Sequence, residues 1–312
     1  MAAGLTTGSR VVAIVGPTAV GKSAAGVAVA RELGGEVVNA DSMQLYRGMD
    51  IGTAKATADE RAGIAHHLLD VWELTEPASV AAYQRLARDA MGEIQGRGAV
   101  PVLVGGSGLY VRGALDALDF PGTSADVRAE LEAMLASTGP AELHARLRAL
   151  DPAAATAIPA TNGRRIVRAL EVIEITGRPF SASPGMTSVP ALFDAVLVGL
   201  APPDRDWLDA RIAARVDRMW AAGLVEEVRR LVERGLRSGR TARQALGYRQ
   251  VLAVLDGEID EATARAQTVQ ATRRFARRQL SWWRRDPRVV WVDASLGTAA
   301  VLGSVKRAWG TN

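Results

Sequence analysis

The sequence predicts an α/β fold, with a P-loop-type parallel sheet core flanked by helices and an all-helical insertion domain. An apolar run of strand length over residues 10–15 leads directly into a glycine-rich segment and then into a helical pattern. Further short apolar runs recur among helical patterns, as is typical of parallel sheets whose strands are joined by helices. Between about 119 and 191 the sequence has helical spacing and no strand-like run. The chain's 312 residues suffice for one large or two modest domains.

The first glycine-rich segment has the pattern G-x-x-x-x-G-K-S of a phosphate-binding loop. It consists of Gly16, Pro17, Thr18, Ala19, Val20, Gly21, Lys22 and Ser23. Its two glycines let backbone N–H groups converge on one centre, and the helix that follows adds its N-terminal dipole. The lysine supplies positive charge to phosphate oxygens, and the serine supplies a hydroxyl for Mg²⁺. The motif predicts a polyphosphate or pyrophosphate ligand, without deciding which.

Composition excludes several classes of site. The chain has no cysteine, which rules out disulfides and thiolate metal sites, and its three histidines make a zinc centre improbable. No apolar run reaches the ~20 residues that span a bilayer, and residues 1–9 lack a secretory apolar core. We therefore expect a cytoplasmic protein without membrane attachment.

A polar cluster follows the second expected strand, residues 36–40. It begins at Asp41, and α/β folds place catalysis at such carboxyl ends of buried strands. Asp41 is equally explained as a helix N-cap with Gln44 three residues later, and the two roles are compatible. Lys55 in the next loop is either a phosphate ligand or a solvated residue. The pair His66 and His67, which leads into a further strand, is interpreted as structural because adjacent side chains diverge.

A second glycine-rich turn follows the expected strand 101–104. It contains Gly105, Gly106, Ser107 and Gly108. The glycines either allow a positive φ that a tight turn requires, or let the backbone approach a ligand closely with the Ser107 hydroxyl exposed. Arg112, one helical turn later, is a candidate phosphate contact.

The segment 119–191 is predicted to be a helical insertion between two halves of the core, 10–118 and 192–312. Helical spacing covers 126–136 and 140–150, and Asn162 is a plausible N-cap for a helix over 163–177. Arg164, Arg165 and Arg168 lie near the start of this helix, where positive charge opposes the helix dipole. This placement indicates an anionic partner, unless Glu171 and Glu174 neutralise the arginines.

After an expected strand over 193–200, the sequence becomes arginine-rich. Helical patterns follow Pro203, cover 225–235 and run from Glu261 to Arg285; a late strand over 289–292 and a final helix close the chain. Between Arg205 and Arg288 there are 19 arginines and 11 acidic residues. Arginines spread over several helices, with aromatic residues among them, favour an RNA surface, because arginine binds phosphate bidentately and aromatic rings stack on unpaired bases.

Six blocks, in this order, resemble bacterial tRNA dimethylallyltransferases, the tRNA isopentenyltransferase family, from about Val11 to Trp291. The blocks are Gly16–Ser23, Asp41–Tyr46, Met49–Lys55, Val104–Tyr110, Arg164–Val172 and Gln244–Arg249. The resemblance implies transfer of a dimethylallyl group from dimethylallyl diphosphate to N6 of adenosine 37, next to the tRNA anticodon, with Mg²⁺ assisting and diphosphate leaving.

The resemblance also implies roles for individual residues. Asp41 matches the general base, Lys22 and the whole loop 16–23 match the diphosphate site, and Ser23 lies near the metal. Ser107 stands where the family usually has threonine and keeps the hydroxyl; with Asp41 and Lys22 it is an implied catalytic residue. The implied tRNA contacts are Asp41, Ser42, Met43, Gln44, Ser107, Arg128, Arg164, Arg165, Arg168, Gln244 and Arg249. Some relatives have arginine in place of Gln244.

Ionisation of an allylic diphosphate is favoured by stabilising the departing negative charge, and the exocyclic amine must lose a proton to a carboxylate. Three alternatives stay open from the residues alone. They are a prenyltransferase acting on a free adenine nucleotide, a phosphotransferase of the nucleoside-kinase kind, and a nucleotide-dependent RNA-binding protein without transfer chemistry. We expect a monomer that binds the anticodon stem-loop of tRNA.

Overall fold

The computed structural model describes residues 10–182 and 189–310, and the chain forms two compact units. The first consists of segments 1–116 and 191–312, and the second of segment 117–190. The predicted boundaries, 118/119 and 191/192, lie within two residues of these. Within the described ranges, no helix has both the length and the apolar character needed to cross a bilayer. The predictions for residues 1–9 and for the last two residues of the final helix lie outside the described residues.

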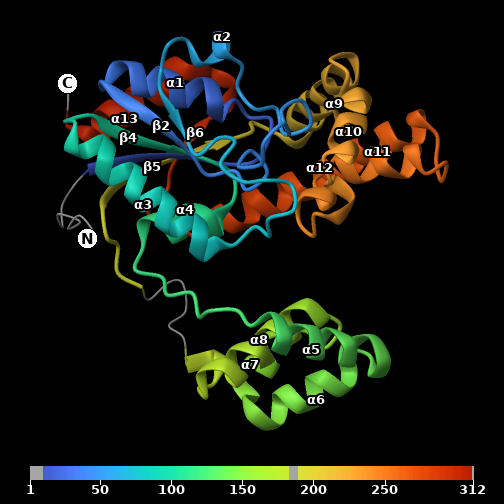
Figure 1. The fold of residues 1–312 in the computed structure, drawn as a ribbon. Helices are drawn as coiled ribbons and strands as arrows, with labels where there is room; N and C mark the ends of the chain where they lie inside the picture. Colours follow the sequence, from blue (N-terminus) through green and yellow to red (C-terminus); the bar gives the residue numbers. More distant parts are fainter. Residues whose placement is uncertain (1–9, 183–188, 311–312) are drawn as a thin grey trace. The chain divides into compact units, whose positions relative to one another are not determined.

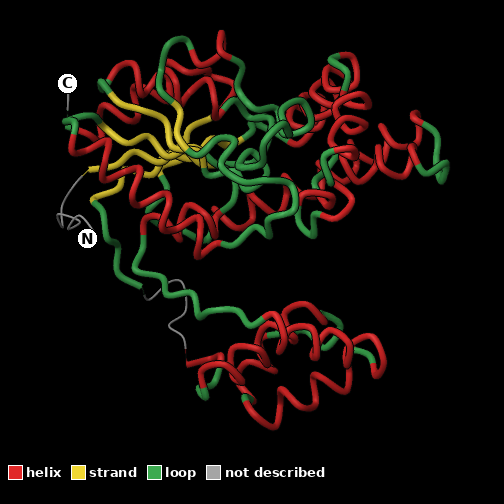
Figure 2. Tube along the Cα trace, viewed as in Figure 1, coloured by secondary structure: helices red, strands yellow, loops and turns green. Residues whose placement is uncertain are grey.

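The first unit is built on a six-stranded parallel sheet with strand order β3-β2-β4-β1-β5-β6. The strands, yellow in Figure 2, lie together in the middle of this unit. The strands are β1 (Arg10–Val15), β2 (Gly35–Asn39), β3 (His66–His67), β4 (Val100–Val104), β5 (Asp194–Ala201) and β6 (Val290–Asp293). Val12 of the central strand β1 pairs with Val102 of β4 on one side and Val196 of β5 on the other. The predicted parallel core is confirmed. β3 ends at His67, because Leu68 and Asp70 have φ of 60° and 57° and leave the extended conformation.

Helices cover both faces of this sheet (Figure 1). On one face lie α1 (Lys22–Glu32) and α13 (Gly297–Trp309), and on the other lie α3 (Val80–Gly96) and α4 (Gly108–Leu115). The remaining helices of this unit are α2 (Ala58–Arg61), α9 (Arg205–Ala221), α10 (Leu224–Glu233), η3 (Leu236–Ser238), η4 (Ala242–Gln244), α11 (Tyr248–Leu255), α12 (Glu261–Trp283) and η5 (Ala294–Leu296). α12 packs against α9, α11 and α4, which brings the arginine-rich part of the chain to the core.

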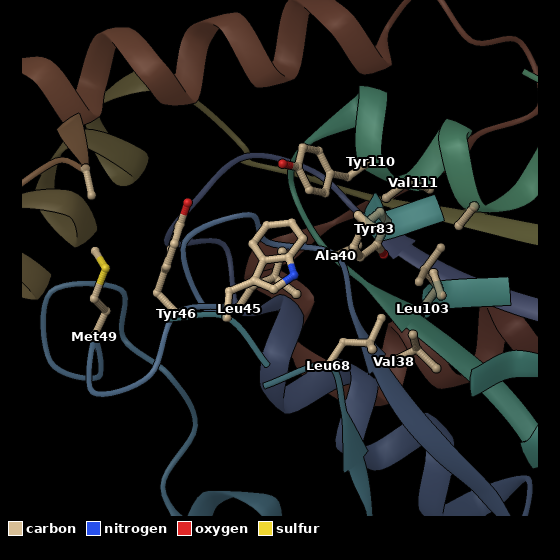
Figure 3. Close-up of a cluster of buried hydrophobic side chains, with 14 of the residues drawn as sticks. Val38, Ala40, Leu45, Tyr46, Met49, Leu68, Tyr83, Leu103, Tyr110 and Val111 are labelled. Atoms are coloured by element: carbon tan, nitrogen blue, oxygen red, sulfur yellow. The ribbon is translucent and has the colours of Figure 1, made fainter. Parts of the chain in front are cut away.

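Each face of the sheet has its own apolar core. On the α3 and α4 side, Val38, Leu103 and Val111 pack together with Tyr83 and Tyr110, whose ring centroids lie 4.7 Å apart (Figure 3). The buried Tyr83 hydroxyl donates to the carbonyl oxygen of Asn39, the last residue of β2. The core on this face therefore holds the end of β2 in place, directly before the polar cluster.

The second unit is a helical bundle. It contains α5 (Ala125–Thr138), α6 (Pro140–Leu150), α7 (Pro152–Ala157), α8 (Gly163–Thr176) and η1 (Phe180–Ala182). Leu131, Leu143, Leu147, Ile166 and Leu170 form its core. The predicted cap is confirmed, since the Asn162 side chain accepts a hydrogen bond from the N–H of Arg165. Sequence periodicity missed the short helices α2 and α7, whose four and six residues are too few to repeat an apolar pattern.

Candidate active site

A pocket opens where the phosphate loop meets the ends of β2 and β4. It brings together residues from the two glycine-rich turns, the polar cluster after β2, and helices α9 and α12. Its lining consists of Thr18, Lys22, Ser23, Val37, Asn39, Asp41, Gln44, Ala54, Ala56, His66, Leu69, Val104, Gly105, Gly106, Arg215 and Gln279. Thr18, Lys22, Ser23, Asp41 and Gln44 were predicted site residues, and the fold gathers them in one cavity.

The phosphate loop has the backbone that its glycines predict. Gly16 and Gly21 have φ of 132° and 100°, and a Cβ on Gly16 would lie 2.6 Å from the carbonyl oxygen of Leu200. Ala19 has φ of 68°, a left-handed conformation that disfavours any side chain. α1 begins at Lys22 with no side-chain cap, so its first N–H groups are available to an anion.

Lys22 is the first cation of the pocket. Its Nζ donates to the carbonyl oxygen of Pro17 at 2.6 Å. Burial of the ammonium group, reinforced by the charge of Arg215, lowers the pKa of Lys22 to about 7, and Asp41 acts in the opposite direction. An anion bound here would favour the charged lysine.

Arg215 of α9 is a second cation in the pocket, and sequence reasoning did not single it out. Its Nη2 donates to the carbonyl oxygen of Thr53 at 3.1 Å. Burial lowers the pKa of Arg215, while the charge of Asp41 raises it; a guanidinium nonetheless stays protonated near neutral pH. Helical periodicity placed arginines along α9 without indicating which one faces the phosphate loop.

Asp41 lies in the same pocket as Lys22 and Arg215. Its Oδ1 accepts the N–H of Met43 at 2.9 Å, and its own N–H donates to Oδ1 of the buried Asn39 at 2.9 Å. The N-cap alternative is wrong, because residues 41–50 form turns rather than a helix. Asp41 therefore has one carboxylate oxygen in a turn hydrogen bond and lies in a cavity next to two cations.

Gln44 does not complete a capping box. Its Nε2 donates toward the carbonyl oxygens of Thr53 and Ala54, at 3.2 and 3.4 Å. These two residues belong to a loop that the buried Glu227 anchors through hydrogen bonds. The Glu227 carboxylate accepts the N–H groups of residues 50, 51 and 52 and the hydroxyl of Tyr248.

Both predicted alternatives for Lys55 are wrong. Its side chain is 3% exposed and forms 2.6 Å ion pairs with Asp50 and Asp70. Its ammonium also donates to the carbonyl oxygen of Tyr46 at 3.1 Å. This lysine thus cross-links the loop that carries the polar cluster and binds no phosphate in this position.

The second glycine-rich turn contributes its backbone. Gly105 and Gly106 line the pocket, and a Cβ on Gly105 would lie 2.4 Å from the carbonyl oxygen of Ala40. Ser107 follows at the start of α4, caps no helical N–H and is absent from the described lining residues. The prediction that Arg112 contacts phosphate is wrong, because its guanidinium is buried in ion pairs with Asp116 and Asp286.

The two adjacent histidines diverge, as predicted. His67 Nε2 lies 2.5 Å from the Glu36 carboxylate, outside the pocket lining. His66 lines the pocket, its Nδ1 faces the carbonyl oxygen of Ile64 at 2.9 Å, and burial lowers its pKa. Among the described residues, no group of three histidine or acidic side chains is placed to hold a metal ion.

Basic surfaces lie on the same unit. On α12, a groove is lined by Arg274, Arg277, Arg278, Ser281, Trp282 and Arg285. A second groove contains Gln244 and Arg249, both predicted RNA contacts, with Arg237 and Arg243. It is also lined by Asp256 and Glu258, and Asp256 forms an ion pair with Arg237. Arginine forks beside an indole suit phosphate and unpaired bases.

In the helical unit, the predicted arginines divide into two groups. Arg164 and Arg165 are exposed at the start of α8. Arg128 and Arg168 both form ion pairs with the buried carboxylate of Glu171, and Arg168 also donates to the carbonyl oxygens of Pro121 and Gly122. Glu171 therefore neutralises Arg168, but not the exposed Arg164 and Arg165.

The chain matches the family described as IPP transferase over residues 44–286. It is 65% identical to a tRNA dimethylallyltransferase of Streptomyces avermitilis over 94% of this chain and 92% of that protein. It is 62% identical to a tRNA dimethylallyltransferase of Salinispora arenicola, over 95% of this chain and 85% of the other.

Solved structures agree with these relatives. The crystal structure of a tRNA isopentenylpyrophosphate transferase from Bacillus halodurans has 42% identity and a TM-score of 0.71, covering 97% of this chain and 96% of that one. Crystallographic snapshots of a eukaryotic dimethylallyltransferase acting on tRNA give 27% identity and a TM-score of 0.78, over 92% of this chain and 74% of that one.

Proposed function

The chain belongs to the IPP transferase family, and we propose that it transfers the dimethylallyl group of dimethylallyl diphosphate to N6 of adenosine 37 in tRNA. The observation that carries the proposal is the single pocket in which the phosphate loop, Arg215 and Asp41 meet. A site that holds two cations and a carboxylate suits a reaction that expels an anion and removes a proton.

In the proposed reaction, the bond between the allylic carbon and the diphosphate oxygen breaks, and a bond from that carbon to N6 forms. Lys22, Arg215 and the free N–H groups at the start of α1 stabilise the departing diphosphate. The N6 proton passes to the Asp41 carboxylate, which lies in the same cavity. The apolar side chains of Val37, Leu69 and Val104 offer the prenyl group a surface away from water.

Mg²⁺ is the proposed cofactor. Its preferred ligands are oxygens from one or two protein side chains, substrate phosphates and water. The Ser23 hydroxyl and the Asp41 carboxylate are oxygen donors in the pocket, which fits a metal held largely by the substrate. Bound there, the ion would neutralise charge on the diphosphate.

The tRNA partner is supported by the arginine-lined grooves on α12 and around Arg249, together with Arg164 and Arg165 on α8. A target adenine must leave the anticodon stack to reach a pocket, at a cost of roughly a few kcal/mol, which backbone contacts offset. We expect the enzyme to act as a monomer in the cytoplasm.

The test is incubation with labelled dimethylallyl diphosphate and either tRNA or AMP, followed by analysis of the product nucleosides. Label on N6 of adenosine 37 supports the proposal. Label on AMP alone, transfer of a γ-phosphate from ATP, or RNA binding without transfer would each favour one of the three other interpretations.

A further inference from the structure

Gln279 of α12 reaches into the phosphate loop, 261 residues away along the chain. Its Oε1 accepts the backbone N–H of Thr18 at 2.8 Å. The residue is 7% exposed and lines the diphosphate pocket. A buried amide that hydrogen-bonds to a loop N–H restrains that loop, because breaking the bond would leave polar atoms unpaired.

The restraint acts next to the strained residue of the loop. Ala19 has φ of 68°, a left-handed conformation that is unfavourable for an alanine. Two side chains hold the surrounding backbone. Gln279 binds the N–H of Thr18, immediately before Ala19, and Arg211 Nε donates to the Ala19 carbonyl oxygen at 2.8 Å. Strained backbone persists only where its surroundings determine it, and here α12 and α9 do so.

The second glycine-rich turn fixes the position of Gln279. A Cβ on Gly106 would lie 2.1 Å from Gln279 Nε2. The fully buried Trp283, one helical turn further along α12, donates from Nε1 to the Gly106 carbonyl oxygen at 3.2 Å. The helix is thereby attached to both turns that form the pocket.

Gln279 faces the pocket rather than the arginine-lined groove of α12. Thr272, Ala276, Gln279 and Trp283 are buried at helical spacing along one side of α12. The arginines that line the groove of α12 are set apart from this buried row. A contact with RNA phosphates along that groove would require a side chain on it.

We infer that Gln279 is a positioning residue for diphosphate binding. By holding the N–H of Thr18, it keeps Ala19 in the left-handed conformation in which the remaining loop N–H groups converge on the diphosphate. The inference rests on the proposed function for its ligand, dimethylallyl diphosphate, but it concerns binding of the diphosphate group itself and can be tested without turnover.

The test compares Gln279→Met with the wild type by calorimetric binding of inorganic pyrophosphate in the presence of Mg²⁺. Methionine keeps the length of the side chain and removes its hydrogen bonds. We expect the Kd for pyrophosphate to rise roughly fivefold to tenfold, the loss of one buried hydrogen bond, while the Kd for tRNA stays unchanged. The exposed Gln270 of the same helix supplies the control, since Gln270→Met should leave both constants unchanged.

Adding Ala19→Gly to Gln279→Met separates positioning from general loss of structure. Glycine adopts positive φ without strain, so the double variant should recover much of the pyrophosphate affinity. If Gln279→Met does not fold, Gln279→Leu serves instead, because leucine also removes the hydrogen bond to the N–H of Thr18 and leaves the glycine turns unchanged. Unchanged pyrophosphate affinity in the folded variant, or a loss that Ala19→Gly does not relieve, overturns the inference. A wild-type enzyme that binds pyrophosphate but prenylates no tRNA overturns the proposed function alone.

Discussion

The ammonium group of Lys22 donates a 2.6 Å hydrogen bond to the carbonyl oxygen of Pro17, five residues earlier in the same loop. The backbone of the phosphate loop therefore holds the Lys22 side chain in place. Burial and the charge of Arg215 lower its pKa to about 7, so the free enzyme carries a largely neutral lysine at pH 8.

This relationship predicts that diphosphate binding takes up a proton. The anion favours the charged lysine and raises its pKa, so binding above pH 7 should protonate Lys22. Pyrophosphate affinity should then fall by up to about tenfold per pH unit as pH rises above 7. Calorimetry in buffers of different ionisation enthalpy measures the uptake. In Lys22→Arg the side chain is protonated before and after binding, so this variant should take up fewer protons than the wild type when pyrophosphate binds. Equal proton uptake by the two proteins would contradict the prediction.

Arg215→Gln should change two quantities together. It removes a cation from the pocket proposed to hold the diphosphate, so the Kd for pyrophosphate should rise, by about tenfold or more for a charged hydrogen bond. Burial is the main cause of the lowered pKa of Lys22, and the charge of Arg215 lowers it further; removing that charge should shift the fall in affinity to higher pH. Pyrophosphate binding measured from pH 6 to 9 checks both. Arg218→Gln, an exposed arginine on the same helix, is the matched control and should leave the pH profile in place.

Asp41→Asn should collapse turnover and leave tRNA binding largely intact. Asparagine retains an oxygen to accept the Met43 N–H, so the turn is preserved, but it cannot take the N6 proton. Loss of a general base reduces kcat by roughly 10²- to 10⁴-fold. Single-turnover prenylation and tRNA binding are measured side by side. Near-normal turnover in the variant would remove Asp41 from the role of base.

Local sequence patterns were enough to predict the phosphate loop, the parallel core and the helical insertion. Each element of these is indicated by residues that lie close together in the sequence. Gly16 to Ser23, for example, carry loop and helix start in eight residues. The contacts of Lys55, Arg215 and Gln279 were not predictable in this way. Each joins segments distant in sequence or depends on which side of a helix is buried, so only the fold decides whether such a side chain meets solvent, an acid or the pocket.

Glu227→Gln should destabilise the core unit without touching substrate. The carboxylate accepts three consecutive N–H groups and the Tyr248 hydroxyl, and an amide replaces one of its acceptor oxygens with a donor. We expect a loss of about 1–3 kcal/mol in the free energy of unfolding. Glu226→Gln is the control, because that neighbouring side chain is 57% exposed in its ion pair with Arg229. Equal unfolding midpoints for the two variants in urea would argue against the loop anchor.

Arg165→Ala should weaken tRNA binding without affecting the fold. Arg165 is exposed at the start of α8. The Asn162 cap accepts a hydrogen bond from the backbone N–H of Arg165, so removing the side chain leaves the cap intact. Removing one phosphate contact should lower the slope of log K against log salt by about one. Arg168→Ala provides the contrast, since that side chain also pairs with the buried Glu171 and should lower the stability of the helical unit as well. tRNA binding from 50 to 300 mM salt, with thermal unfolding of each variant, distinguishes the two arginines. An unaltered salt slope in Arg165→Ala would exclude this side chain from the RNA interface.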